Sequence, residues 1–382
     1  MRGMEREMGK QRILTAVDGH YEILDQYFDE IGSRKVLLVC DSSIGFLAIN
    51  TYFLALASRK GIEVVRFDDF VPNPLYESVV KGVRILHETG CDSIAAVGGG
   101  SAMDVAKCIK LYSNMDDSIN YLKQEIVAND IPFLAVPTTA GTGSEATRYA
   151  VIYYEGAKQS VTHESCIPAT VLMDSSVLAT LPAYQKKSTM MDALCHAIES
   201  FWSVNSTDES KVYSGEAIRA IMANMDRYLA GDEAAHAAML RAANTAGRAI
   251  NITQTTAGHA MCYKVTSLYG AAHGHAALLC DRVLFPWMLE HTDRCIDPRG
   301  EEYLKGVFDK IAEAMGCPSP AAAAARLEEL RDALGLEVPE ASAEDIEVLS
   351  TSVNPVRLKN HPIALDGETI RQLYRKILGV QS

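Results

Sequence analysis

The sequence contains no apolar run that approaches the roughly 18 residues needed to cross a membrane. Its nine cysteines include no CxxC pair, and the polar first eleven residues have no apolar stretch typical of a secretory signal. We therefore expect reduced thiols and a cytoplasmic protein without a membrane partner.

Basic residues are outnumbered, with 36 Lys and Arg against 49 Asp and Glu. The formal charge of -13 argues against nucleic acid as a partner, so any anionic ligand must meet a local cluster of cations.

Strand and helix signals alternate in the first half of the chain. Short apolar runs predict strands at 35–40, 62–67, 93–97 and 131–136, with helical spacing between them, as at 79–89. This alternation predicts a parallel sheet with crossover helices. Beyond about Leu181 the strand signals vanish, and helices are predicted at 190–201, 208–229, 234–251, 301–315 and 321–334. At roughly 100–200 residues per domain, we expect an α/β domain over 1–181 and an all-helical domain over 182–382.

Two loops with phosphate-binding chemistry follow predicted strands. The first, Gly98–Asp104, follows the third predicted strand and opens a helix, where glycines and free N–H groups suit a pyrophosphate. Met103 holds the sixth position, so the segment is not a GxGxxG fingerprint, and an ordinary Rossmann domain is not supported. The second, Pro137–Glu145, offers threonine hydroxyls and glycine amides after the fourth predicted strand. The two loops indicate one dinucleotide at the carboxyl edge of the sheet; the alternative is a pair of tight turns without a ligand.

Four residues in the second half have the chemistry of a metal site. Asp192 and His196 stand four apart in a helical stretch, which places both side chains on one helix face. His259 and His273, fourteen residues apart, fit two neighbouring helices that close on that face. One carboxylate and three imidazoles suit Fe(II) or Zn(II) and leave a position for a substrate oxygen. Taken singly, each histidine also fits an ordinary polar or surface role, so the prediction rests on their combination with the two loops.

These segments together resemble the iron-containing alcohol dehydrogenase family, whose fold is also that of dehydroquinate synthase. The matching strings are GGGSAMDVAK from Gly98, PTTAGTGSEAT from Pro137 and MDALCHAIE from Met191, with the segments around His259 and His273. The resemblance implies an α/β dinucleotide-binding domain and an all-helical catalytic domain, with the active site in the cleft between them. It implies hydride transfer between NAD(H) or NADP(H) and a small aldehyde or primary alcohol, in a homo-oligomer, most simply a dimer.

The resemblance also implies roles for single residues. Asp192, His196, His259 and His273 would bind the metal. The implied cofactor contacts are Gly99, Gly100, Ser101, Thr138, Thr139, Thr142 and Thr147, with Asn73 and Lys158 assisting.

Asp41 follows the strand at which the adenine ribose is usually read. A carboxylate there accepts hydrogen bonds from the ribose 2′-OH and repels a 2′-phosphate, which favours NAD over NADP. A turn-capping aspartate is the alternative, and the neighbouring Ser42 and Ser43 are compatible with a phosphate.

One position departs from the family pattern. Many members carry a further histidine four residues after the one that matches His259, and here that position is Tyr263. We expect Tyr263, or His275 two residues past His273, to relay protons; plain packing is the alternative for both.

Three basic residues fall in segments expected to border the active site: Arg148, Lys264 and Arg357. Cations that converge on a pocket in an acidic protein suit a carboxylate or a phosphonate; three surface cations are the alternative. The string NPVRLKNHP from Asn354 resembles the branch of the family that reduces phosphonoacetaldehyde to 2-hydroxyethylphosphonate.

Other substrates that stay open are a short diol, an unbranched primary alcohol, and 4-hydroxybutyrate with succinic semialdehyde. A lyase of the dehydroquinate synthase type, or a binding protein without turnover, is a more distant alternative.

Overall fold

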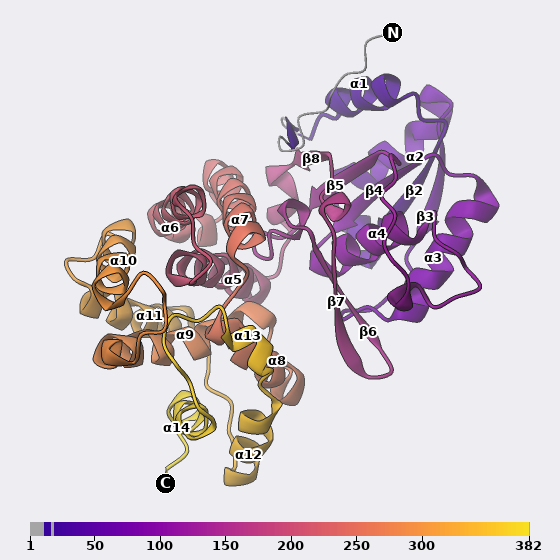
Figure 1. The fold of residues 1–382 in the computed structure, drawn as a ribbon. Helices are drawn as coiled ribbons and strands as arrows, with labels where there is room; N and C mark the ends of the chain where they lie inside the picture. The colour runs from indigo at the N-terminus through magenta and orange to yellow at the C-terminus, as the bar shows by residue number, and fades with distance from the viewer. Residues whose placement is uncertain (1–10, 17–18, 382) are drawn as a thin grey trace. The chain divides into compact units, whose positions relative to one another are not determined.

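The computed structural model describes residues 11–16 and 19–381, which divide into two compact units (Figure 1). The first unit ends at Thr180. The second begins at Leu181 and also takes in Ala140–Gly143, a short loop segment from within the first half of the chain.

A parallel sheet of six strands forms the centre of the first unit. The strand order is β1 (Arg12–Thr15), β8 (Thr170–Met173), β5 (Phe133–Pro137), β4 (Ser93–Gly98), β2 (Lys35–Cys40) and β3 (Glu63–Phe67). Every residue of β4 and β5 is buried, as expected for continuous apolar runs covered on both faces. The four predicted strands are confirmed within two residues at each end.

The strand count from the sequence was too low. The strands β1 and β8 have only four residues each, too few for a periodic signal, and so the glycine loop follows the fourth strand of the chain rather than the third. An antiparallel hairpin of β6 (Tyr149–Tyr154) and β7 (Ala157–Thr162) was also missed.

The helices of this unit are α1 (Glu22–Ile31), α2 (Ala48–Lys60), α3 (Tyr76–Thr89) and α4 (Gly100–Tyr112), with short 3₁₀ turns at Ser42–Phe46, Tyr121–Lys123, Ser144–Ala146, Glu164–Cys166 and Ser175–Leu178. The chain leaves β2 toward β3 on one side and later continues from β4 to β5 on the other. The gap between β2 and β4 is therefore the topological switch point, where ligands bind in open α/β sheets. Cys40 pairs with Val97, and Gly98 pairs with Pro137, so the carboxyl ends of β2, β4 and β5 lie level with one another.

Every helix or strand assigned in the described part of the second unit is a helix, as predicted. Its elements are α5 (Ala183–Trp202), α6 (Asp208–Leu229), α7 (Glu233–Thr253), α8 (Ala257–Tyr269), α9 (His273–Glu290), α10 (Glu301–Ala314), α11 (Pro320–Leu334), α12 (Ala343–Ser352), α13 (Pro355–Leu358) and α14 (Gly367–Leu378), with a 3₁₀ turn at Thr292–Arg294. The helix α5 packs against α6, α7 and α9, and every residue from Met190 to Trp202 is buried. This central helix carries the first two predicted metal ligands, Asp192 and His196.

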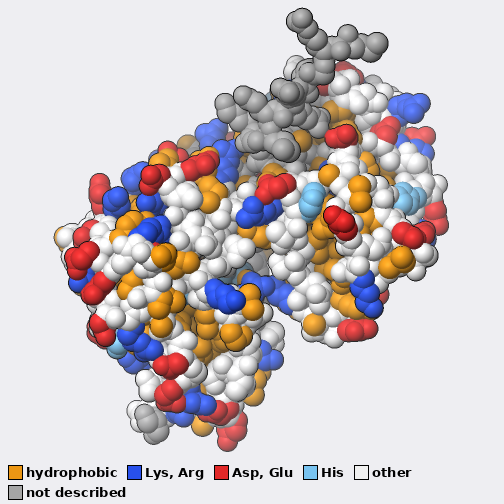
Figure 2. Space-filling model, in the orientation of Figure 1, with side chains coloured by type: hydrophobic (Ala, Val, Ile, Leu, Met, Phe, Trp, Pro, Cys, Tyr) orange, Lys and Arg blue, Asp and Glu red, His pale blue; other side chains and the backbone are white. Residues whose placement is uncertain are grey.

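The cysteines, helices and surface charges of the described residues bear on three expectations from the sequence. All nine cysteines lie in the described part of the chain and are free thiols, as expected. Among the described residues, no helix is both long and apolar enough to span a bilayer. On the face drawn in Figure 2, basic and acidic side chains are interspersed rather than gathered into a broad basic area.

His361 is a buried histidine in the helical unit. Its side chain is fully enclosed, its ring meets Trp202 edge-on with centroids 6.5 Å apart, and neither ring nitrogen has a hydrogen-bond partner among the described residues. Burial lowers the pKa of His361 to about 3, against the opposing charge of Glu199. The ring of folded His361 is therefore neutral at pH values well above 3.

This burial predicts a pH dependence of stability. Below the ordinary pKa of 6.5, His361 binds a proton in the unfolded chain but not in the folded one. The free energy of unfolding therefore falls as the pH is lowered from 6.5 toward 3. Between pH 7 and pH 5 the loss from this one group is about 2 kcal/mol. The variant His361→Leu should lose that much less unfolding free energy over the same interval, measured by urea denaturation. The exposed His20→Leu serves as the control, and an equal loss in parent and His361→Leu would contradict the assignment.

Candidate active site

Three helices of the second unit bring four predicted metal ligands around one oxygen atom. Asp192 and His196 lie one turn apart on α5, His259 lies near the start of α8, and His273 is the first residue of α9. From Asp192 Oδ1 the Nε2 atoms of His196, His259 and His273 lie at 4.0, 3.4 and 4.0 Å. Ligand atoms at the corners of a tetrahedron with bonds of about 2.1 Å lie about 3.4 Å apart. The donor set and its spacing therefore fit a divalent ion such as Fe(II) or Zn(II).

The four side chains are not equivalent. The ligand atoms of Asp192, His196 and His259 all lie within 4.8 Å of one another, and His273 falls outside that group. The side chain of His273 is 35% exposed, whereas those of His196 and His259 are 7% and 1% exposed. The site is thus closed on three sides and accessible beside His273, as expected for a catalytic metal that keeps an open position.

A glycine allows this close approach of helices. A Cβ atom at Gly274 would lie 2.1 Å from the carbonyl oxygen of Ser188 and 2.6 Å from Cβ of Asp192. Only a residue without a side chain lets the start of α9 lie directly against α5, and this contact places His273 beside Asp192.

The electrostatics of the group favour positive charge at its centre. Burial alone would raise the pKa of Asp192, but the neighbouring rings, His196 first, hold it well below its usual range. Burial lowers the pKa of His196 to about 4, which keeps its ring neutral and able to donate a lone pair. Burial also opposes protonation of His259, but the carboxylates of Glu199 and Asp192 raise its pKa to about 10. A proton or a divalent cation is therefore stabilised at the His259 ring.

Two residues that the sequence analysis did not single out contact Nδ1 of the His259 and His273 rings, the nitrogen that is not directed at Asp192. Glu199 Oε1 accepts a short hydrogen bond from His259 Nδ1. Cys262 Sγ lies 3.6 Å from His273 Nδ1 and donates to the carbonyl of His259 over 3.3 Å. For Glu199 a signal was present, since it stands seven residues after Asp192 and therefore shares the same face of α5.

A basic residue adjoins the accessible side of the group. The ring of Tyr263, one turn after His259 on α8, stacks on that of His273 with centroids 5.4 Å apart and an angle of 23°. Arg357 of α13 donates from Nη1 to the Tyr263 hydroxyl over 3.1 Å, and its guanidinium lies 4.8 Å from the ring centroid. Burial raises the pKa of Tyr263 despite Arg357, so the hydroxyl keeps its proton near neutral pH. Lys264 is half-buried and projects about 100° around α8 from Tyr263.

The other predicted relay, His275, is held by packing partners at both ring nitrogens. The hydroxyl of Tyr184 lies 3.0 Å from Nδ1, and Nε2 lies 2.9 Å from the carbonyl oxygen of Glu337, which can only accept. The backbone N–H of His275 also donates to Ser188 Oγ over 3.0 Å. These contacts favour a structural role, and its role as a proton relay stays a prediction.

The first unit gathers predicted cofactor residues at the switch point. Gly99 precedes α4 as its N-cap residue and supplies no side-chain cap, which leaves the N–H groups of Gly100 and Ser101 for a ligand. Ideal Cβ atoms at Gly98 and Gly99 would lie 3.5 Å from Asp41 Oδ2 and from the Thr139 side chain, respectively, so the ends of β2, β4 and β5 converge there. The backbone N–H of Thr138, the residue before Thr139, donates to the carbonyl of Gly98 over 3.0 Å.

Asp41 has a structural contact at this place as well. Its Oδ1 accepts from the backbone N–H of Ser43 over 2.8 Å and caps the short turn Ser42–Phe46. Oδ1 therefore has the turn-capping role that was the alternative for Asp41. Oδ2 lies toward Gly98 and has no hydrogen bond within the described part of the chain.

A buried lysine, also not singled out from the sequence, secures the threonine loop. Lys107 Nζ donates to Ser144 Oγ, Thr147 Oγ1 and the carbonyl of Tyr149 at 3.0, 3.2 and 2.7 Å. Asp104, one turn earlier on α4, accepts from Ser144 Oγ over 2.9 Å. Burial lowers the pKa of Lys107 against the attraction of Asp104. The hydroxyl of Thr147 thus contacts Lys107, and the signal for this network was the Asp and Lys three apart in GGGSAMDVAK.

The remaining predicted residues lie on loops and on the hairpin. Asn73 is exposed between β3 and α3 with φ of 60°, a conformation that asparagine tolerates. Lys158 lies on β7 opposite Tyr153. Thr142 belongs to the loop segment Ala140–Gly143, which is part of the second, helical unit. Arg148 forms an ion pair with Glu164 at 2.7 Å.

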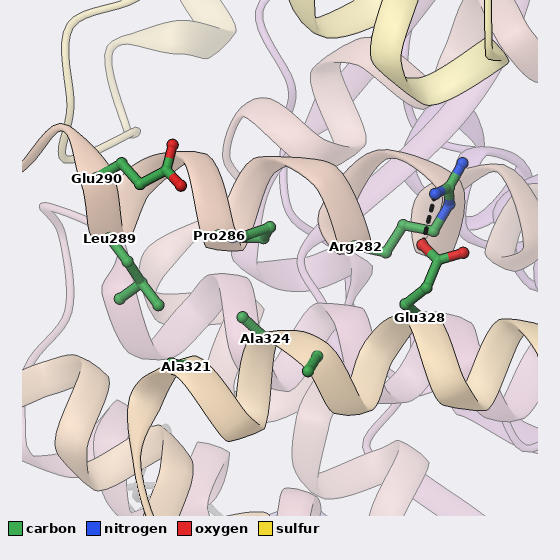
Figure 3. A pocket seen from close by; sticks show the side chains of 8 residues that line it. Arg282, Pro286, Leu289, Glu290, Ala321, Ala324 and Glu328 are labelled. Carbon is green, nitrogen blue, oxygen red and sulfur yellow. Dashed lines mark hydrogen bonds and ion pairs between the residues drawn. The ribbon is translucent and has the colours of Figure 1, made fainter.

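A cavity of about 400 Å³ between α9 and α11 lies apart from these groups (Figure 3). Its wall combines Pro286, Leu289 and three alanines with an ion pair between Arg282 and Glu328 at 2.6 Å. His273 and Pro286 are thirteen residues apart on α9, about 20 Å along a helix. This cavity therefore does not form part of the candidate metal centre.

Comparison with known proteins matches both halves of the chain to one family. The family model of the iron-containing alcohol dehydrogenases matches residues 13–175, and that of the C-terminal part of the same family matches residues 186–378. A phosphonoacetaldehyde reductase of Streptomyces viridochromogenes is 34% identical over 312 residues, which cover 78% of this chain and 79% of the relative. An NAD-dependent methanol dehydrogenase of Bacillus methanolicus is 30% identical over 263 residues, which cover 67% and 68% of the two chains.

Solved structures share the fold over nearly the whole chain. An iron-containing alcohol dehydrogenase of Thermotoga maritima is 28% identical with a TM-score of 0.81, over 97% of this chain and 98% of that one. A sulfoacetaldehyde reductase of Bifidobacterium kashiwanohense, solved with NAD+, has a TM-score of 0.85 over the same shares at 24% identity, which supports the fold alone. With both halves matched by the family models, this chain belongs to the iron-containing alcohol dehydrogenase family, and is an oxidoreductase that uses a nicotinamide cofactor and a divalent metal.

Proposed function

We propose that this enzyme reduces a small anionic aldehyde, with phosphonoacetaldehyde as the first candidate, and that it uses NADH. The observation that carries the proposal is the guanidinium of Arg357 on the ring of Tyr263, which stacks on His273. A fixed cation thus stands beside the accessible side of the metal group, in a chain whose formal charge is -13. The 34% identity to a phosphonoacetaldehyde reductase supports the same substrate. The family resemblance also supports a cytoplasmic homodimer.

Arg357 is the strongest of the three predicted substrate cations. A guanidinium is planar and binds phosphonate or carboxylate oxygens through two parallel N–H groups. Its contact with Tyr263 holds one edge in place, while α13 leaves the side chain partly exposed. Arg148 already has Glu164 as a partner, and Lys264 projects away from Tyr263, so both enter the proposal as secondary contacts.

Asp192, His196, His259 and His273 would hold the metal. When bound, the metal polarises the carbonyl oxygen of the aldehyde, and the nicotinamide supplies the hydride. Arg357 orients the anionic end of the substrate. Tyr263 keeps a proton at Oη, in contact with Arg357 and against the ring of His273, and is therefore our candidate proton donor to the product.

The cofactor would bind at the switch point of the sheet. The N-terminus of α4 with Gly99, Gly100 and Ser101 suits the pyrophosphate, and Thr138 and Thr139 lie at the neighbouring strand end. Oδ2 of Asp41 suits the ribose hydroxyls and repels a 2′-phosphate. We therefore infer a preference for NADH.

The metal assignment predicts the effect of removing single ligands. His259→Ala and His273→Ala should each lose most of the bound metal and of the activity, because a tetrahedral site that lacks one imidazole binds its ion poorly. Elemental analysis with turnover assays measures both, and circular dichroism reports the fold. His291→Ala, a histidine of the same unit outside the group, is the control. Stoichiometric metal and full turnover in His273→Ala would exclude this ligand.

The cofactor assignment predicts a shift in specificity. Asp41→Asn keeps an oxygen to cap Ser43 but removes the negative charge, so kcat/KM for NADPH should rise relative to NADH; Asp41→Gly should act in the same direction. Steady-state kinetics with both cofactors measures the ratio. If neither variant changes it, Asp41 only caps its turn.

The substrate assignment predicts a loss confined to anionic aldehydes. A charge-assisted contact contributes about 1.5–3 kcal/mol, so Arg357→Ala should lower kcat/KM for phosphonoacetaldehyde by on the order of 10–100-fold. The slow reduction of butanal should stay nearly unchanged, because it has no anion for Arg357 to bind. Lys359→Ala, an exposed cation two residues away, is the matched control.

Three aldehydes separate the outcomes of this experiment. Equal parent kcat/KM for phosphonoacetaldehyde, succinic semialdehyde and butanal would refute an anion site. A strong preference for succinic semialdehyde would keep the site and replace phosphonate by carboxylate. An anion preference that persists in Arg357→Ala but is lost in Arg148→Ala or Lys264→Ala would move the contact to one of those residues.

A further inference from the structure

Glu199 is a completely buried carboxylate that has no role in the function proposed above. It lies on α5, seven residues after Asp192 and three after His196, and so on the face of the helix that bears both. A buried charge is costly unless it is fully hydrogen-bonded. Glu199 is therefore expected to have hydrogen-bond donors at both carboxylate oxygens.

Four donors converge on this carboxylate. Oε2 accepts from the backbone N–H of Thr256 at 2.5 Å and from Oγ1 of the same residue at 2.7 Å. Oε1 accepts from the backbone N–H of His259 at 3.0 Å and from its ring Nδ1. Trp202 Nε1 donates to Thr256 Oγ1 over 2.8 Å, which directs the threonine hydroxyl proton toward Glu199.

These contacts make Glu199 the cap of another helix. The helix α8 begins at Ala257 after Thr256, and no side-chain cap is present at its own N-cap residue. The carboxylate from α5 takes that place, with its negative charge at the positive end of the α8 dipole. One side chain thus connects the start of α8 to the helix that bears Asp192 and His196.

The same carboxylate orients a metal ligand. Because all its other partners are donors, Glu199 accepts the proton of His259 Nδ1, and Nε2, which lies 3.4 Å from Asp192 Oδ1, is the nitrogen left to bind a metal ion. The approach also requires Gly258, since a Cβ atom there would lie 2.7 Å from Glu199 Oε1 and 1.9 Å from Asp281 Oδ1.

We propose that Glu199 is the positioning residue of the metal centre, which sets the tautomer and orientation of His259 by capping α8 and bonding the ring with one carboxylate. This inference rests on the proposed metal role of His259. It adds a residue that contacts neither the ion nor the substrate and acts through His259.

The test uses the metal-free full-length protein titrated with Co(II), whose visible absorption reports ligand geometry. Loss of a carboxylate that orients a metal-bound histidine typically weakens metal binding by 10–100-fold, which we expect for Glu199→Ala together with a changed Co(II) spectrum. Glu199→Gln keeps the volume and one acceptor oxygen, but its NH₂ group faces a donor, so we expect a smaller loss of affinity. If Glu199→Ala does not fold, Glu199→Gln decides the question.

A second helix cap separates this role from simple stability. Asp232 caps α7 by accepting from Ala235 N at 2.9 Å and lies on none of the ligand-bearing helices. Asp232→Ala should lower Tm without altering Co(II) affinity or spectrum. If both Glu199 variants likewise lose only Tm, Glu199 is merely a cap and the inference is overturned. If instead the parent binds no Co(II), or His259→Ala binds it as tightly as the parent, the metal assignment itself fails.

Discussion

Buried charge on one face of α5 is the constraint on which the helical unit depends. Asp192, His196 and Glu199 are all buried, and ionisable groups so placed are tolerated only when neighbours satisfy them. The neighbours are the first turns of α8 and α9, which bring His259 and His273. The positions of three helices and the geometry of the metal group are therefore consequences of one electrostatic requirement.

The α/β unit meets a similar requirement with opposite sign. Lys107 is fully buried on α4, and its ammonium group is satisfied by Ser144, Thr147 and a carbonyl of the threonine loop. Because the N-terminus of α4 lies at the switch point, the same helix carries the proposed phosphate site and holds the neighbouring loop. In both units a buried ion thus fixes backbone that lies next to the proposed chemistry.

The proposed substrate anion is compatible with this acidic protein because the cation proposed to bind it is local and held by neighbouring side chains. Arg357 lies on the face of Tyr263, where cation–π attraction and one hydrogen bond restrict its motion. The ring of Tyr263 contacts both the guanidinium of Arg357 and the ring of His273. Tyr263 thus brings a guanidinium next to the ring of His273, one of the four predicted metal ligands.

The sequence by itself determined the fold class, the longer strands and helices, and the identity of the chemistry-bearing motifs, because periodicity and local spacing encode these. Tertiary structure alone decided which side chains meet. The contact of Glu199 with His259 spans sixty residues, and that of Arg357 with Tyr263 spans ninety-four. It also decided that both nitrogens of His275 are occupied by packing partners. No local pattern reports such contacts, since they depend on how helices distant in the chain satisfy each other's buried polar groups.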